Sequence, residues 1–203
     1  MFRNMATRIT AVTATVAMIA FGVVVLEAPA YAATTITVGT TVDGDANSAC
    51  TNPVVTATVS PATLRNAICV ANNIGGVVEI SVPAGEYALT LGQLEVGTTS
   101  GSDITIRSIS GVATIEADGT HRVMMLDPNL VGGVAVRLDG LTITGGDDNE
   151  FGGGGIIGGS YDAPVGDLLI VSNSSFVDNH ANTDGTDATN RPGGGIQFIG
   201  GSL

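Results

Sequence analysis

Short runs in which apolar and polar residues alternate fill most of the chain after residue 76. Alternation at every second position is typical of strands that bury one face, and Gly, Asp, Asn, Ser and Thr, which favour turns, separate the runs. This part of the chain therefore predicts a succession of short strands without a recurring helix. The predicted strands are 78–82, 87–91, 104–109, 113–117, 122–126, 134–138, 141–144, 156–157, 168–171, 175–177 and 196–199.

The segment before residue 76 predicts one strand, a polar loop and one helix. Alternating residues place the strand within 34–42, and the loop follows over 43–52. We expect Ser60 to be the N-cap of the helix and Pro61 its first residue, and the helix to stop at 72–76. Its apolar stripe recurs at helical spacing, at Leu64, Ile68 and Ala71. Because so short a helix is stable only against other structure, we expect it to cover exposed core.

Strands at this spacing fit a sandwich or a solenoid, and internal self-similarity favours the solenoid. The residues Gly-Gly-Gly-Ile at 153–156 recur at 193–196, and 141–143 is echoed around Ser175 and Phe176. Coils of about 20 to 30 residues, each with two or three short strands, build a parallel β-helix. Aliphatic side chains fill its narrow interior, which agrees with an aromatic content of only 4%. The predicted fold class is all-β, a parallel β-helix (solenoid) with a short N-terminal capping helix.

Composition adds that the chain folds and that its surface is acidic. Hydrophobic residues make up 44% of the chain and charged residues 13%, a balance that supports a buried core in a single domain. The formal net charge is -12, and all seven cationic residues are arginines. Such a chain lacks the basic surface that neutralises phosphates. We therefore expect no nucleic-acid partner and no binding to anionic membranes.

The first 32 residues have the pattern of a secretory signal peptide. Arg3 and Arg8 precede the apolar run 11–25, and Ala-Tyr-Ala at 30–32 provides a small-residue cleavage site. The run is shorter than the about 20 residues of a membrane span, and the two arginines are not adjacent, which favours Sec-type export. We expect a secreted or cell-surface protein without a membrane span in the mature chain. The expected segments are 1–32, the signal peptide; 33–76, the strand, loop and capping helix; and 77–203, the coils.

Cys50 and Cys69 are the only cysteines. An even number of cysteines in an exported chain predicts one disulfide, which contributes about 3 kcal/mol in the loop-entropy model. The alternative is a pair of buried free thiols.

Three segments resemble known bacterial families. Residues 63–68 read TLRNAI and resemble the leucine-arginine-alanine helix motif of the CSLREA-type domain, which begins bacterial surface and secreted right-handed parallel β-helix proteins. Residues 82–89, VPAGEYAL, resemble the segment that follows that motif. Residues 176–179, FVDN, and the Gly-Gly-Gly-Ile repeats resemble the repeats of chlamydial polymorphic outer membrane proteins. Ala62 and Thr63 stand where the CSLREA motif has a cysteine. The residues that match the motif are Leu64, Arg65, Ala67 and Ile68. The resemblance implies a right-handed parallel β-helix.

Acidic loops provide weak candidates for catalysis. Residues 182–187, NTDGTD, resemble a signature of polygalacturonase-type hydrolases, in which carboxylates activate water and protonate the leaving oxygen. Gly146-Asp147-Asp148 resembles their second acidic motif, but the two motifs occur here in reversed order and the later histidine motif is missing. The catalytic candidates are Asp147, Asp148, Asp184 and Asp187. The alternative is that these residues simply favour turns.

A calcium-dependent lyase is a further candidate. Oxygen ligands for a possible Ca²⁺ occur in two groups, Asp147, Asp148 and Glu150, or Asp178, Asp184 and Asp187. No lysine is available as a base, and no known calcium-loop spacing is present. The two histidines, His121 and His180, are expected at coil corners.

Other polar residues are expected to be structural. We expect Arg65 to bind strand carbonyls or pair with an acid near the helix. Stacked asparagines such as Asn173 and Asn179 are expected to form hydrogen-bonded ladders inside the coil turns.

These observations favour an adhesin-like protein or a structural surface stalk that binds glycans or extracellular proteins. The alternative is a polysaccharide-degrading lyase or glycoside hydrolase that uses the acidic loops, and a third possibility is a spacer without a ligand. An enzyme needs its carboxylates clustered on one face of consecutive coils, whereas a stalk scatters them. Residues 193–203 begin a coil without a cap, so we expect a fragment of a longer protein or edge-to-edge association at this end.

Overall fold

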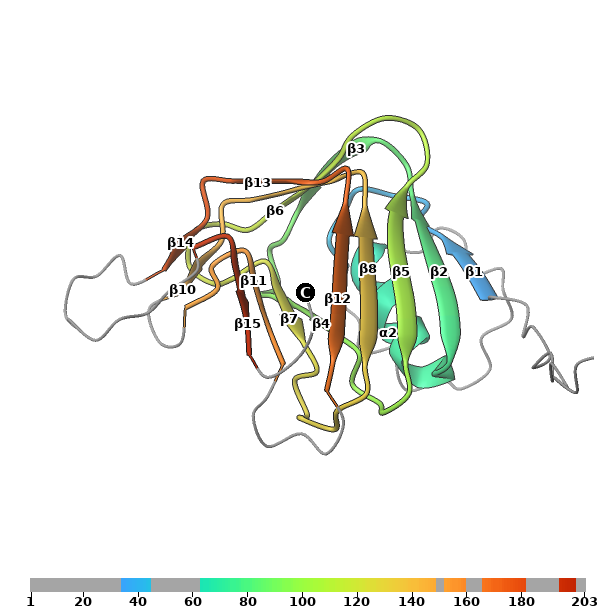
Figure 1. Ribbon diagram of the computed structural model, residues 1–203. Coiled ribbons are helices and arrows are strands. Elements are labelled where there is room, and N and C mark those ends of the chain that lie inside the picture. The colour runs from blue at the N-terminus through green and yellow to red at the C-terminus, as the bar shows by residue number, and fades with distance from the viewer. Residues whose placement is uncertain (1–33, 45–62, 149–151, 160–165, 182–193, 200–203) are drawn as a thin grey trace, which may run out of the picture. The chain divides into compact units, whose positions relative to one another are not determined.

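The computed structural model describes residues 34–44, 63–148, 152–159, 166–181 and 194–199. These residues form parallel β-sheets and one short helix (Figure 1). The predicted signal peptide, 1–32, lies outside the described residues, as do seven other residues named above. These are Cys50, Ser60, Pro61, Ala62, Glu150, Asp184 and Asp187.

Three sheets take their strands in the same order along the chain. The first sheet contains β1 (Thr34–Thr37), β2 (Val77–Val82), β5 (Asp103–Ser108), β8 (Ala135–Asp139) and β12 (Leu168–Ser172). The second sheet contains β3 (Gly85–Ala88), β6 (Ala113–Glu116), β9 (Leu141–Thr144) and β13 (Ser175–Val177). The third sheet contains β4 (Leu94–Val96), β7 (Met124–Leu126), β11 (Ile156–Gly158) and β15 (Ile196–Phe198). A short pair, β10 (Asp147–Asp148) and β14 (His180–Ala181), lies between the second and third sheets in the chain order.

From β2 onward, the chain therefore passes through the first, second and third sheets four times. We call each passage a circuit, and circuits 1 to 4 begin at β2, β5, β8 and β12. Every pairing between described strands is parallel. Side-chain hydrogen bonds between neighbouring circuits join residues 26 to 36 positions apart.

The core consists of rows of apolar side chains that run from circuit to circuit. In the first sheet, Val78, Ile104, Val136 and Leu169 stand opposite one another in register, and each is at most 1% exposed. In-register stacking follows from the alternating pattern, because a shift of one residue would turn every apolar side chain outward.

The predicted internal repeats lie side by side in the structure. Ile156 of the first Gly-Gly-Gly-Ile segment pairs with Ile196 of the second through β11 and β15. Likewise Thr142 and Ile143 of β9 pair with Ser175 and Phe176 of β13. Both repeats therefore mark equivalent positions in circuits 3 and 4.

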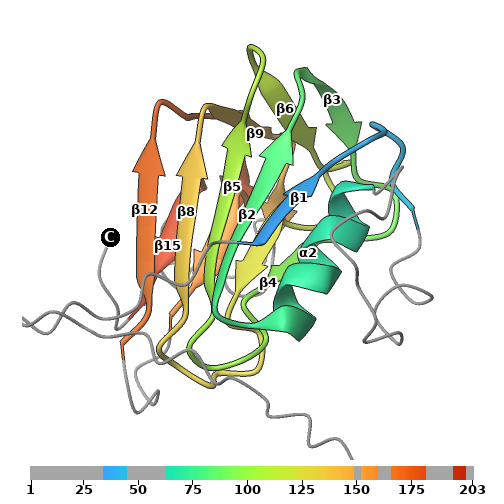
Figure 2. The same ribbon diagram turned by 90° about the vertical axis from the view of Figure 1, so that its right-hand side faces the viewer.

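Helix α2 (Leu64–Ile74) packs against β2 and β4 near β1 (Figure 2). Its N-cap is Thr63, whose hydroxyl accepts a hydrogen bond from the N–H of Asn66 at 3.1 Å. The prediction of Ser60 as N-cap and Pro61 as first helical residue is therefore wrong. The helix begins about one turn later, because the Thr63 side chain provides the acceptor for the free N–H of the first turn. At the other end, Gly75 is the C-cap with a φ of 65°, a conformation that glycine adopts without strain.

The strand predicted at 87–91 has the wrong bounds, since β3 spans Gly85–Ala88. The N–H groups of Thr90 and Leu91 donate to the carboxylate of Asp43 at 2.8 and 3.0 Å, so this stretch leaves the ladder. Three strands were not predicted: β4, β10 and β14. They contain only two or three residues each, and the parallel neighbour, rather than local propensity, holds them in place.

Candidate functional site

The two acidic candidates that the structure describes lie where the second sheet gives way to the third. Asp147 and Asp148 form β10, and Asp147 stands opposite His180 of β14. The N–H of Asp147 donates to the carbonyl of His121 in circuit 2 at 3.1 Å. Stacking thus brings both histidines of the chain beside the acidic pair, in three consecutive circuits. We call these residues, together with Arg122, the corner cluster.

An ion pair neutralises one of the two acids. The guanidinium of Arg122 lies 2.5 Å from the carboxylate of Asp148, and the two side chains are only 9% and 14% exposed. Arg122 also donates to the side-chain carbonyl of Gln93 in circuit 1 at 3.3 Å. These contacts join circuits 1, 2 and 3. The carboxylate of Asp148 is therefore engaged in an ion pair between circuits and is poorly placed to act as a free acid or base.

His121 has polar neighbours on both sides of its ring. Its Nδ1 lies 2.8 Å from the carbonyl of Arg122, and its Nε2 lies 3.3 Å from the carboxylate of Asp118. Hydrogen bonds from the hydroxyl and the N–H of Thr120 lower the pKa of Asp118. His180, in contrast, is exposed at the corner of circuit 4.

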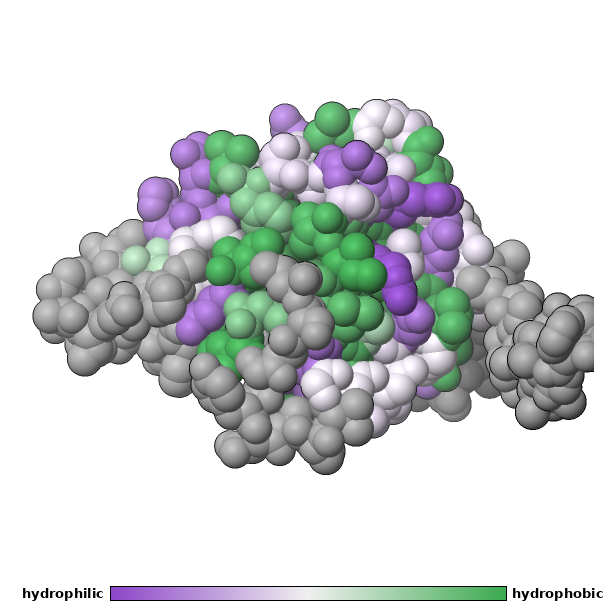
Figure 3. Space-filling model, viewed as in Figure 1, coloured by the Kyte–Doolittle hydropathy of each residue, from purple (hydrophilic) through white to green (hydrophobic). Residues whose placement is uncertain are grey.

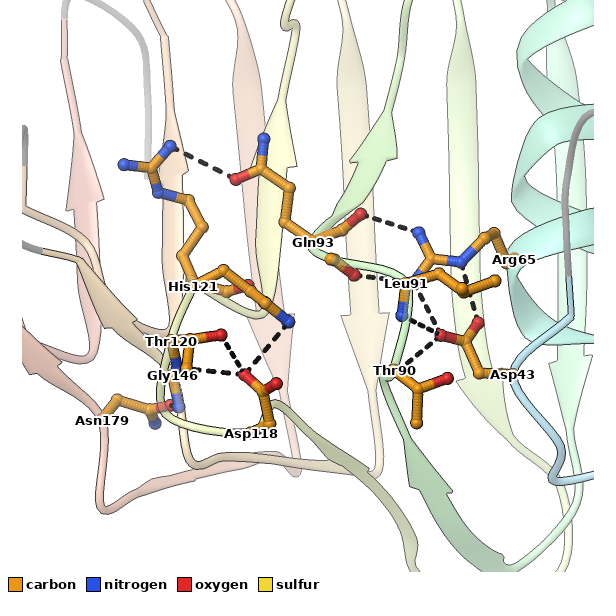
Figure 4. A network of polar contacts seen from close by, with 12 residues as sticks. Asp43, Arg65, Thr90, Leu91, Gln93, Asp118, Thr120, His121, Gly146 and Asn179 are labelled. Carbon is orange, nitrogen blue, oxygen red and sulfur yellow. Dashed lines mark hydrogen bonds and ion pairs between the residues drawn. The ribbon is translucent and has the colours of Figure 1, made fainter.

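A second polar group, centred on Arg65, lies at the N-terminal end of the stack (Figure 4). Arg65 donates to both carboxylate oxygens of Asp43, at 2.8 and 3.0 Å, and to the carbonyls of Gly92 and Gln93, at 2.6 and 2.8 Å. Burial raises the pKa of Asp43, but hydrogen bonds from Arg65, Thr90 and Leu91 outweigh it and hold the pKa below its usual range. Arg65 thus pairs with an acid near the helix, as expected, whereas the carbonyls that it binds belong to the turn before β4 and not to a strand. The other residues of its motif, Leu64, Ala67 and Ile68, are buried.

A pocket of about 330 Å³ lies between α2 and β4. Arg65, Asn72, Gln93 and Glu95 provide polar groups in its wall. However, the guanidinium of Arg65 already binds Asp43 and two backbone carbonyls. Asn72 links the helix to the third sheet, because it donates to the carbonyl of Glu95 at 2.9 Å and accepts from the N–H of Gly97 at 2.7 Å. These groups fasten the helix to circuit 1.

The amide side chain of Asn179 holds a corner in the same way. It donates to the carbonyl of Ile143 at 2.8 Å and accepts from the N–H of Gly146 at 3.1 Å. Asn173 donates to the carboxylate of Asp139 at 2.8 Å, and this contact lowers the pKa of Asp139. Both asparagines therefore bond to the preceding circuit and do not form a ladder with each other.

The calcium candidates are only partly placed. Asp178 is exposed and has a positive φ of 50°, whereas its proposed co-ligands Asp184 and Asp187 lie outside the described residues. Within the described ranges, no group of three or more His, Cys, Asp or Glu side chains could hold a metal ion. Cys69 is buried on α2 and is not a free thiol, but Cys50 lies outside the described residues, so the pairing of the two stays a prediction.

Sequence reasoning missed several residues that join the circuits. Arg122 and Gln93 lie in short segments without a recognisable motif, and Asp127 and Asp167 lie in turns, where an aspartate is ordinarily solvated. Burial distinguishes them, since Asp127 is 0% and Asp167 4% exposed. Only the stacking of circuits reveals this.

No protein-family model, curated protein or solved structure matches the chain. In the part of the chain that the structure describes, no helix is long and apolar enough to cross a membrane. What the protein does is therefore inferred from its own residues.

Proposed function

We propose that the protein is a secreted or cell-surface right-handed parallel β-helix that acts as an adhesin-like surface stalk and binds glycans or extracellular proteins. The repeated order of three parallel sheets supports the β-helix, and the signal-peptide pattern supports export. The contacts of Arg65 between α2, Asp43 and circuit 1 support the role of the helix as a CSLREA-type N-terminal cap.

The observation that carries this proposal is the distribution of the acidic side chains. They occur on all three sheets and at the turns instead of around one cavity; examples are Glu79, Glu86, Glu95 and Asp103. Several are also paired with neighbours in the stack. Glu79 pairs with Arg107 at 2.8 Å, and Asp103 pairs with Arg137. Scattered and internally paired carboxylates suit an extended scaffold better than an active site.

A second candidate is a polysaccharide-degrading enzyme, and the corner cluster favours it. Stacking places the backbone of Asp147 between those of His121 and His180, so one aspartate and two histidines occupy neighbouring positions in consecutive circuits. Such groups perform general acid and base chemistry. The ion pair between Asp148 and Arg122 weighs against the two-carboxylate arrangement of glycosidases.

We also propose edge-to-edge association at the end formed by circuit 4. Val171, Phe176, Ile196 and Phe198 pack against the core but remain partly exposed, and Ile170 and Val177 are 41% and 47% exposed. Figure 3 shows apolar surface gathered in the middle of this view. An edge strand with partly exposed apolar side chains is prone to pair with another strand. Analytical ultracentrifugation should therefore detect association that Val177→Lys weakens.

One experiment separates the two main candidates. The mature protein is tested for retention on a panel of immobilised glycans and, with the same polysaccharides, for release of reducing ends or unsaturated sugars. The stalk proposal expects binding without product, both for the parent protein and for Asp147→Asn. Product release that Asp147→Asn abolishes, while the exposed control Glu116→Gln retains it, would establish the enzyme instead. Binding to none of the glycans or matrix proteins tested would support a spacer.

A further inference from the structure

Two buried carboxyl groups meet where the chain passes from the third sheet to the first. Asp127 directly follows β7 and is 0% exposed, and Asp167 directly precedes β12 and is 4% exposed. Carboxylates are almost never so deeply buried without a compensating partner. No arginine or histidine contacts either group through a described ion pair.

The two side chains share a run of consecutive backbone N–H groups in the turn of circuit 2. The N–H groups of Val131 and Gly132 donate to the two carboxylate oxygens of Asp127 at 2.9 and 2.8 Å. The N–H of Val134 donates to Oδ1 of Asp167 at 3.0 Å, and the N–H of Gly133 also bonds to that carboxyl group. Residues 131–134 therefore hold both groups against each other.

The second carboxyl oxygen of Asp167 indicates which of the two side chains carries a hydrogen atom. Oδ2 of Asp167 is buried and receives no hydrogen bond from a donor of the described residues. The side chain of Asp167 lies within hydrogen-bonding reach of Asp127. Two ionised carboxylates only accept hydrogen bonds, so this contact requires a hydrogen atom on one of them. Since both oxygens of Asp127 already accept N–H donors, the hydrogen belongs to Asp167.

We propose that Asp127 and Asp167 form a proton-binding site that joins the turn of circuit 2 to the end of circuit 3. Asp167 is the protonated member and donates to the ionised Asp127. Burial, together with the neighbouring charge of Asp127, raises the pKa of Asp167. The shared proton supplies the bond that a pair of anions could not make.

A metal cation is a poorer ligand for the same site. Ca²⁺ requires six to eight oxygen ligands, roughly, and both oxygens of Asp127 are directed at N–H hydrogens instead. The segments packed against the pair add no charge: 97–102 and 128–134 contain no acidic or basic side chain. Asp127 is the charged group that acts on Asp167, while Tyr161 and Asp162 lie outside the described residues.

The proton makes stability depend on pH in a defined direction. Because the folded pKa of Asp167 is raised, its full contribution is present below the unfolded pKa and is lost as pH rises through the folded pKa. Over that window the unfolding equilibrium constant should increase by up to about tenfold per pH unit from this one group.

Infrared spectroscopy of the mature protein in D₂O provides the direct test. In a titration from acidic pH, we expect the carbonyl band of one protonated carboxylic acid to persist at pH values where exposed carboxyl groups are already ionised. Asp167→Asn should remove this band, and Asp118→Asn, which changes an exposed aspartate, should retain it. The absence of the band from the parent protein overturns the proposal, and this result does not depend on whether a variant folds.

Chemical denaturation across a pH series provides the second readout. Asp167→Asn retains a donor toward Asp127, so it should fold and lose the decrease in stability that accompanies rising pH. Asp127→Asn turns amide hydrogens toward the N–H donors and should be destabilised at every pH. Equal pH slopes for the parent protein and Asp167→Asn overturn the proposal, as does stabilisation by Ca²⁺ that requires Asp167.

Discussion

The two ends of the stack are built differently. At the N-terminal end, α2 and β1 flank β2, and the core residues of the helix and its neighbours are at most 7% exposed. In circuit 4, Leu169 of the first sheet is still buried, but the interior rows of the second and third sheets reach Phe176 and Ile196, which are only partly buried. In a stacked protein each circuit is buried by its neighbours, so the free energy of unfolding is distributed along the stack. The buried residues around α2 and the partly exposed residues of circuit 4 should therefore respond differently to the same kind of substitution.

Truncation of an interior side chain should give the largest contrast. Ile106 of β5 is 0% exposed between two circuits, and Ile106→Ala should lower the free energy of unfolding by about 4 kcal/mol, through lost burial and a residual cavity. Ile170→Ala in β12, where the side chain is 41% exposed, should lower it by less than about 1 kcal/mol. Urea denaturation followed by circular dichroism measures both. Ile106 faces the interior, whereas Ile170 lies in the outward-facing row of Thr105 and Arg137, so equal losses would contradict the unequal burial of the two side chains.

Removal of the Arg65 side chain should weaken the attachment of α2 to circuit 1. Arg65→Ala leaves the carboxylate of Asp43, which is 3% exposed, without its cation, and a loss of about 3 kcal/mol is expected. Arg107→Ala is the matched control, because its ion pair with Glu79 is 45% and 28% exposed and should contribute at most about 1 kcal/mol. If the two variants lose the same stability, Arg65 does not fasten the helix.

Substitution of Asn72 and of Asn179 should give a smaller difference in stability between the two ends. Asn72→Ala should cost about 2 kcal/mol, because it leaves a buried N–H of Gly97 and the carbonyl of Glu95 without partners. Asn179→Ala, at the partly exposed corner of circuit 4, should cost about 1 kcal/mol, since water replaces its bonds. Hydrogen exchange should show faster exchange near each substitution. A larger loss of stability in Asn179→Ala than in Asn72→Ala would contradict the greater burial of the contacts at the helix end.

The smallest expected effect is a difference in pH dependence. The lowered folded pKa of Asp43 means that its contribution is present above the unfolded pKa and is lost as pH falls through the folded pKa. Asp43→Asn should therefore reduce the acid-induced loss of stability, whereas Asp167→Asn should reduce the loss at higher pH. Denaturation midpoints at several pH values check both. The same slope change in both variants would contradict the opposite shifts.

Much of the β structure could be predicted because strand patterning is local. Alternation placed β5, β6, β8, β9, β12 and β13 within a residue or two, and the Gly-Gly-Gly-Ile repeat identified β11 and β15 as equivalent. The structure also gives a physical reason for the glycines of this repeat, which the sequence pattern alone did not provide. A side chain on Gly154 would meet the carbonyl oxygens of His180 and Gly146, so neighbouring circuits approach too closely there for any Cβ.

The candidate site was predicted less well because its residues come from different circuits. Asp147 and Asp148 were found as an acidic motif, but their partners were not, since His121 and Arg122 lie in the preceding circuit. The register that unites them depends on the length of every intervening turn. Neither residue type nor local spacing encodes that length.

The sequence by itself determined which residues face the interior, because alternation of apolar side chains is decided within each strand. It also determined the helix that contains Arg65 and the recurrence of equivalent strands. Only the tertiary structure decided which charges meet. Asp43 came to lie against Arg65, Asp148 against Arg122 and Asp167 against Asp127. The physical reason is that stacking in register places distant residues in contact and removes water from between them, so that an ordinary turn aspartate becomes a buried acid.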